Sequence, residues 1–141
     1  MRIPFLQKVA VRKITSDVTG ASRERATEIL EGILQELPEL LLATIVDLNS
    51  GRLLAAYTKQ AQSDPYKVTT YAVATARQLA RLPAQPGLAT QQLQDLVLVL
   101  DEQLYVLRLT ADQQWGCLLL VYTHDTNLAL AREVLRKHSG Q

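Results

Sequence analysis

Cysteine is almost absent from this sequence, which excludes several kinds of protein. Cys117 is the single cysteine in 141 residues, so neither an intramolecular disulfide nor a cysteine-based zinc site can form. A reducing compartment suits such a chain, and we expect a cytoplasmic location. Long apolar runs are missing as well: the N-terminus has no continuous signal-peptide run, and no later stretch approaches the roughly 18 residues that span a bilayer. We therefore expect a soluble protein.

The sequence also lacks an excess of one charge. Fifteen lysines and arginines nearly balance fourteen acidic residues, so the chain lacks the excess of positive charge that a nucleic-acid binder carries. We therefore predict that nucleic acid is not a partner. The charge is unevenly placed, because the first thirteen residues carry Arg2, Lys8, Arg12 and Lys13 and no acid. We interpret residues 1–18 as a basic extension that is mobile or loosely docked, because chain termini are usually poorly ordered. The alternative is an amphipathic helix that contacts a membrane surface or an acidic partner.

Sequence motifs of catalysis and metal binding are missing too. Neither the phosphate-binding pattern G-x-x-x-x-G-K-[ST] nor the nucleophile pattern G-x-S-x-G occurs. His124 and His138 stand at opposite ends of the predicted last helix, too far apart to share a metal ion. Cys117 lies in an apolar run and is predicted to be an inert core thiol, and Asp101-Glu102 is predicted to be a solvated turn. We therefore predict no catalytic residues, no metal site and no cofactor.

What the sequence does contain is a strong hairpin pattern at residues 41–58. Two apolar runs flank Asp47 to Gly51, where Asn49 and Ser50 favour a turn and Gly51 can adopt the positive φ of a short hairpin loop. Alternate residues of the first run place apolar side chains on both faces of the strand. The hairpin is therefore predicted to be covered on both sides.

Helices are predicted before and after this hairpin. The first has Ser22 as its N-cap and ends before Pro38. Gly32 inside it costs about 1 kcal/mol relative to alanine, unless a neighbouring backbone passes close by. The last helix has Asp125 or Thr126 as its cap and ends near Gly140.

Three strands are predicted between the second helix and the last, at residues 95–100, 104–110 and 115–123. The element order is thus helix, two strands, helix, three strands, helix. A chain of 141 residues with 48% hydrophobic content suits one compact domain, which we place at residues 19–141.

The second predicted helix carries two apolar stripes instead of one. It begins at Asp64-Pro65, an N-cap followed by proline at the first position, and ends at Leu82-Pro83. We assign the first stripe to the chain's own sheet; it comprises Val68, Tyr71, Ala72, Thr75, Leu79 and Leu82. We assign the second to a helix of another subunit; it comprises Tyr66, Thr69, Val73, Ala76 and Ala80. The alternative is one unusually wide core face.

Two segments of the sequence resemble a known family. These are Leu42 to Ala55, with the turn Asp47-Leu48-Asn49-Ser50-Gly51, and Leu119 to Arg132, with Tyr122-Thr123-His124-Asp125. Together, at this spacing, they are similar to the roadblock family, which includes dynein light chains and the bacterial and archaeal partners of Ras-like small GTPases. The resemblance covers residue 19 to the end. Ala129 stands where the family often has glycine.

The resemblance implies an α+β sandwich and a homodimer. The expected fold is a five-stranded antiparallel sheet with the first and third helices on one face and the second helix on the other. Family members usually pair their second helices and third strands, which here adds Val97 and Val99 to the dimer interface and covers an apolar strand that would otherwise be an open edge.

We therefore expect a non-enzymatic homodimer that binds and regulates a Ras-like small GTPase, with activation of GTP hydrolysis as one form of regulation. The candidate rim for that partner comprises Lys67, Arg77 and Arg81. A structural adaptor that does not read nucleotide state is the alternative. A third hypothesis, a small-molecule sensor, requires a sizeable apolar pocket.

Overall fold

The computed structural model describes residues 13–60, 62–81 and 92–139. The elements lie in the predicted order: α2 (Ala21–Glu36), β1 (Leu42–Asp47), β2 (Leu53–Thr58), α3 (Pro65–Leu79), β3 (Asp95–Val99), β4 (Gln103–Leu109), β5 (Trp115–Tyr122) and α4 (Leu128–His138). The strands form one antiparallel sheet in the order β2-β1-β5-β4-β3. The predicted fold class is confirmed.

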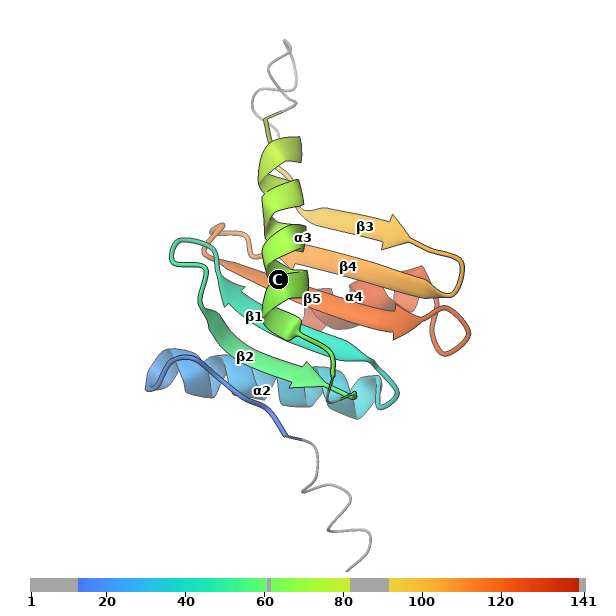
Figure 1. Ribbon diagram of the computed structural model, residues 1–141, viewed down its shortest axis with the longest axis horizontal. Helices are drawn as coiled ribbons and strands as arrows, with labels where there is room; N and C mark the ends of the chain where they lie inside the picture. The colour runs from blue at the N-terminus through green and yellow to red at the C-terminus, as the bar shows by residue number, and fades with distance from the viewer. Residues whose placement is uncertain (1–12, 61, 82–91, 140–141) are drawn as a thin grey trace, which may run out of the picture.

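The sheet lies between two helical layers. α3 crosses one face, and α2 and α4 cover the other, where they also contact each other (Figure 1). On β1, Ala43 and Ile45 belong to the core under α2 and α4, whereas Leu42 and Val46 belong to the apolar clusters under α3. The hairpin is therefore covered on both sides, as its pattern predicts.

The turn between β1 and β2 forms as its residues predict. The Asp47 side chain accepts a hydrogen bond from the Asn49 backbone N–H at 2.9 Å, and the Gly51 N–H donates to the Asp47 carbonyl at 2.8 Å. Gly51 has a φ of +78°, a left-handed conformation that side chains with a Cβ rarely adopt. The turn is held by its own local hydrogen bonds.

The predicted N-cap of α3 is confirmed, whereas the predicted N-caps of α2 and α4 are wrong. Asp64 accepts a hydrogen bond from the Lys67 N–H, and Pro65 follows at the first position of α3. α2 instead has Gly20 at its N-cap, without a side-chain bond, so the assignment to Ser22 is wrong. Asn127 caps α4 by accepting from the Leu130 N–H at 2.8 Å, which corrects the choice between Asp125 and Thr126. α3 ends at Leu79 and not at residue 82.

Gly32 of α2 lies against His138 of α4. A Cβ at Gly32 would stand 2.4 Å from Nδ1 of His138, so only glycine fits without movement of the imidazole ring. The other ring nitrogen of His138 hydrogen-bonds the Glu36 carboxylate, and this bond is the main cause of the lowered pKa of Glu36. The predicted close approach exists, but a side chain makes it and not a backbone.

A buried pair of hydroxyl groups joins α3 to the sheet. Thr69 donates to the Pro65 carbonyl at 2.6 Å, and its oxygen lies 2.8 Å from the Thr44 hydroxyl, which completes the chain as the donor. Thr44 is 0% exposed and Thr69 is 1% exposed. Both groups are thus satisfied within an apolar interface.

Replacing Thr69 by valine is expected to lower the free energy of unfolding by about 1–2 kcal/mol. The valine keeps the volume but leaves the Thr44 hydroxyl without its buried acceptor, and an unsatisfied buried polar group costs about that much. Urea denaturation followed by circular dichroism measures the change. The double variant, with Thr44 also replaced by valine, removes both hydroxyls and is expected to recover part of the loss. No recovery would mean that the two hydroxyls do not interact.

Residues 13–18 lie against the domain. Thr15 pairs with Ala56 of β2, and Ile14 and Val18 pack on the core beneath α2. This part of the predicted loose extension is therefore docked, whereas Arg2, Lys8 and Arg12 lie outside the described residues. Within residues 13–60, 62–81 and 92–139, the helices are too short or too polar to cross a membrane.

Candidate interaction surface

The stripe of α3 that the chain's own sheet buries is not the one predicted. Thr69, Val73 and Ala76 are buried against the chain's own sheet, with at most 8% of each residue exposed. These side chains therefore form the inner face of α3, which was predicted to be Val68, Tyr71, Ala72, Thr75, Leu79 and Leu82, and the dimer interface itself stays a prediction. Tyr66, at 54% exposed, and Ala80, also exposed, remain on the surface.

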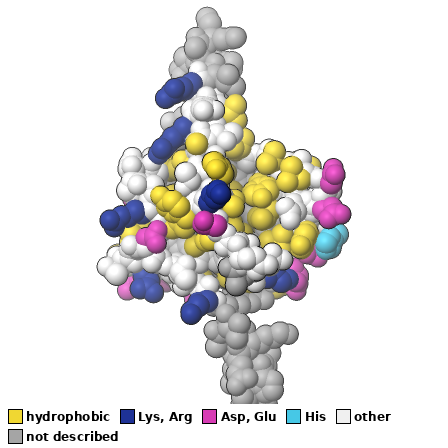
Figure 2. Space-filling model, viewed as in Figure 1, with side chains coloured by type: hydrophobic (Ala, Val, Ile, Leu, Met, Phe, Trp, Pro, Cys, Tyr) yellow, Lys and Arg dark blue, Asp and Glu magenta, His cyan; other side chains and the backbone are white. Residues whose placement is uncertain are grey.

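The stripe that was assigned to the sheet is instead turned to the surface. Tyr71 is 65% exposed and Leu79 36% exposed, while Val68 and Ala72 are half-buried. In Figure 2, hydrophobic side chains gather beside α3 over β3 and β4. This apolar stripe is therefore the free face of the helix. Leu82, its predicted last member, lies outside the described residues.

An apolar groove runs between this stripe and strands β3 to β5. Its volume is about 310 Å³. We call it the α3–β3 groove; it is lined by Val68, Tyr71, Ala72, Thr75, Leu96, Val97, Leu98, Tyr105, Leu107 and Leu118. Leu98 of this lining is 52% exposed, and the next two residues, Val99 and Leu100, are 63% and 44% exposed. Such a contiguous apolar surface is typical of an interaction site.

β3 forms an edge of the sheet, and its outer backbone groups can be identified. The Leu109 N–H donates to the Gln94 carbonyl, and the Leu100 N–H donates to the Gln103 carbonyl, so residues 94 and 100 face β4. Because hydrogen bonding alternates along an antiparallel strand, Leu96 and Leu98 also face β4, and Asp95, Val97 and Val99 direct their N–H and C=O groups outward. Within the described part of the chain, no segment lies along this edge.

The first residue of the edge strand is fixed by two arginines. The Asp95 carboxylate contacts Arg108 of β4 at 3.0 Å and Arg132 of α4 at 2.7 Å, and only 9% of its side chain is exposed. This arrangement ties β3 to its neighbouring strand and to the helix below. No sequence pattern joins these three residues, because the contacts depend on how the elements pack. The start of the edge strand is thus held in place.

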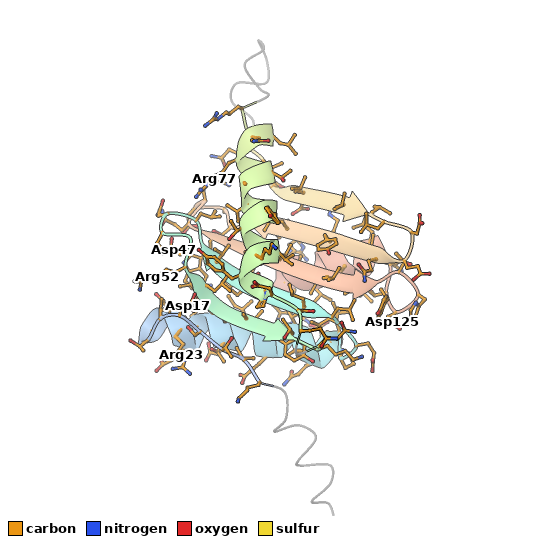
Figure 3. The ribbon with its side chains drawn as sticks, in the orientation of Figure 1. Asp17, Arg23, Asp47, Arg52, Arg77 and Asp125 are labelled. Carbon is orange, nitrogen blue, oxygen red and sulfur yellow. The ribbon has the colours of Figure 1, made fainter. Side chains whose placement is uncertain are left out.

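The three predicted rim residues do not form one cluster. Lys67 lies in the first turn of α3 and Arg81 beyond its last residue, about 20 Å apart at the rise of a helix. Arg77 donates to the Leu48 carbonyl, so its guanidinium is engaged with the β1–β2 turn. Figure 3 labels Arg77 on the same side of the molecule as Asp47 and Arg52. Lys67 and Arg81 are both exposed.

Side chains that could carry chemistry are dispersed. Cys117 is fully buried, and burial raises the pKa of its thiol to about 12, as expected of a core thiol that stays protonated. Asp101 and Glu102 are exposed in a turn, as predicted. Among the described residues, His, Cys, Asp and Glu side chains form no group of three or more that could hold a metal ion.

Comparison with known proteins identifies this architecture. No family model matches the sequence, and no curated protein matches it significantly. Among solved structures, MglB of Myxococcus xanthus has a TM-score of 0.72 at 10% identity, covering 87% of this chain and 88% of that chain. A Roadblock/LC7 domain from Streptomyces avermitilis has a TM-score of 0.54 at 18% identity, covering 79% and 90%. The chain has the roadblock fold.

A second MglB structure, in a tetrameric arrangement, has a TM-score of 0.68 at 19% identity and covers 89% of this chain and 90% of that chain. At these identities the likeness establishes the roadblock fold. The fold implied by the sequence resemblance is thereby confirmed, and α3 is the helix that stands alone on its face of the sheet.

Proposed function

We propose that this chain is a non-enzymatic roadblock module that forms a homodimer and, as a dimer, binds and regulates a Ras-like small GTPase. The carrying observation is the α3–β3 groove, an apolar surface continuous with the β3 edge, which no described segment covers. We also propose a cytoplasmic location, because a reducing compartment suits a chain with a lone cysteine.

The dimer that we propose joins the two β3 strands antiparallel about a two-fold axis at Val97. Asp95, Val97 and Val99 direct their backbone groups outward, so an axis at the middle residue uses all of them. Val97 then faces Val97 of the second copy, and Asp95 faces Val99 of that copy. Shifting the axis by one residue would pair one end of each strand with a residue outside Asp95–Val99. The central register therefore makes the most hydrogen bonds.

The same two-fold axis brings the free stripes of the two α3 helices toward each other. Ala72 and Thr75 are small, which allows close approach, and Tyr71 and Leu79 are exposed apolar side chains that gain burial. The interface that we propose thus comprises Tyr71, Ala72, Thr75 and Leu79 with Val97 and Val99. It replaces the buried Thr69, Val73 and Ala76 of the sequence-based assignment and keeps Tyr66 and Ala80 at its margin.

A GTPase-binding role is supported by the fold and by the family that the sequence resembles. The solved structures with this fold include MglB proteins. On this chain we assign two exposed cations to the GTPase contact, Lys67 in the first turn of α3 and Arg81 just beyond its last residue. Arg77 is assigned instead to holding the β1–β2 turn, because its guanidinium is already engaged. Activation of GTP hydrolysis is one form that the regulation can take.

The affinity for a small GTPase of the same organism is expected to differ at least tenfold between the GDP form and a form with a non-hydrolysable GTP analogue. A regulator must bind the two states differently, and a tenfold ratio corresponds to about 1.4 kcal/mol. Isothermal titration calorimetry against each nucleotide form measures the ratio. Equal affinities would contradict regulation and favour the structural adaptor. Binding to neither form of any small GTPase of that organism would remove the proposal.

The volume and lining of the α3–β3 groove also suit an apolar small molecule. This second candidate makes an opposite expectation about assembly. A ligand in the groove would occupy the surface that we assign to the second copy, so it would dissociate the dimer. Light scattering with and without added hydrophobic ligands distinguishes the two candidate functions, because only a ligand that binds the groove would dissociate the dimer.

A further inference from the structure

The other edge of the sheet, β2, is covered by the chain itself. Thr15 and Ala56 exchange two backbone hydrogen bonds, of 2.9 and 2.8 Å. Farther along, the Asp17 N–H donates to the Leu53 carbonyl at 3.0 Å, and the Leu53 N–H donates to the Asp17 carboxylate at 3.3 Å. Residues 14–17 therefore run beside β2 and bond it at Ala56 and Leu53; we call this segment the edge strap.

The strap satisfies the backbone groups that β2 directs outward. The Lys59 N–H bonds the Leu41 carbonyl, and the Asp47 N–H bonds the Arg52 carbonyl, so Leu53, Ala56 and Thr58 are the positions that face away from β1. Both groups of Ala56 and both groups of Leu53 have partners on the strap. Within the described residues, the strap's backbone bonds thus reach Leu53 and Ala56 but not Thr58.

The Asp17 side chain bonds β2 at a point where the residue spacing of β2 and that of the strap differ. A register shift in the β1–β2 pairing places the outward positions Leu53 and Ala56 three residues apart, whereas Thr15 and Asp17 are two residues apart. The carboxylate reaches the Leu53 N–H that a strand carbonyl would otherwise meet. A side-chain acceptor thus closes the edge where regular strand pairing cannot.

The strap is also packed, which distinguishes it from a chance contact. Ile14, Ser16 and Val18 alternate with exposed residues and are half-buried, and Ile14 and Val18 contact the core under α2. The Ser16 hydroxyl bonds the backbone of Val18 at 3.1 Å. Period-two alternation is what a strand with one face on a core requires.

We propose that the edge strap confines strand-to-strand association of this protein to the β3 edge. β2 carries neither charge nor proline in Leu53–Thr58, so without the strap it would be an edge able to pair with a second copy. An open β2 and an open β3 on one chain would allow dimers to join end to end without limit. The end-to-end joining of dimers rests on the proposed pairing at β3. The cover that the strap gives to β2 can be tested without that pairing.

The test uses Thr15→Pro in the full chain, with Thr15→Val as the matched control. Proline removes the N–H that bonds Ala56 and disfavours the strap, whereas valine keeps the N–H on an exposed strand position. We expect the Ala56 amide to exchange hydrogen at least tenfold faster in Thr15→Pro and unchanged in Thr15→Val. In sedimentation velocity, Thr15→Pro is expected to form species larger than the wild type as concentration rises.

Two results would overturn the proposal. If the Ala56 amide stays protected in Thr15→Pro, residues 14–17 do not cover the edge. If it is exposed but the mass does not rise, the cover does not limit assembly. Should proline unfold the protein, Asp17→Ala exposes the Leu53 amide alone and supports the same comparison. A wild type that is monomeric would remove the β3 dimer, yet Thr15→Pro would still have to associate through β2.

Discussion

Replacing Ala72 by glutamate is expected to convert the dimer of this protein into a monomer. Ala72 lies midway along the free stripe of α3 and is half-buried at the α3–β3 groove. In the dimer the new carboxylate would be enclosed by apolar side chains without a partner, and burying an unpaired charge is strongly unfavourable. We expect the dimer dissociation constant to rise at least a hundredfold, about 2.7 kcal/mol.

Light scattering after size exclusion checks this result against the chain mass of 15.7 kDa. Thr70→Glu is the matched control, because Thr70 neighbours the stripe in sequence but is exposed and does not line the groove. It should remain dimeric. The circular dichroism spectrum of Ala72→Glu should match that of the wild type, because the side chain can reach solvent in the monomer. A wild type that is monomeric at micromolar concentration would contradict the dimer.

A cysteine at position 97 tests the register of the same interface. Directly paired residues on hydrogen-bonded antiparallel strands have Cα atoms about 5.5 Å apart, which lies within the range for a disulfide. Val97→Cys is therefore expected to give a cross-linked dimer under mild oxidation. Cys117 is fully buried and should not interfere. If Leu96→Cys or Leu98→Cys cross-links and Val97→Cys does not, the two-fold axis lies one residue away from Val97.

The second large effect is expected at the contact between α2 and α4. Gly32→Ala should lower the free energy of unfolding by about 1–2 kcal/mol, because a Cβ at 2.4 Å from His138 forces the ring to move. Moving the ring also breaks its hydrogen bond to Glu36. These costs exceed the roughly 1 kcal/mol by which alanine favours a helix interior over glycine.

The sign of the same substitution should reverse when the ring is removed. In a His138→Ala background the clash disappears, so Gly32→Ala should raise the free energy of unfolding by about 0.5–1 kcal/mol through helix propensity alone. Urea denaturation of the four proteins in this mutant cycle measures both signs. A stabilising effect of Gly32→Ala with His138 present would show that the ring yields without cost, contrary to the packing argument.

Local features of the sequence determined the elements of this protein. The Asp47 to Gly51 turn and the Asp64-Pro65 helix start form through contacts within a few residues, so the pattern alone predicts them. The element order follows from hydrophobic periodicity, which is also local. Together with the resemblance of two segments, this was sufficient for the roadblock fold.

The candidate surface was decided by tertiary structure. Both stripes of α3 are apolar, and a helical wheel cannot say which one the sheet will bury; the Thr44–Thr69 hydroxyl pair shows that a polar residue belongs to the inner stripe. The same holds for the pairing of Thr15 with Ala56 and for the bond from Arg77 to the Leu48 carbonyl, which join residues far apart in the chain. Sequence determined which elements form, because propensity and capping act locally. Packing determined which faces remain free, because that depends on what the rest of the chain places against them.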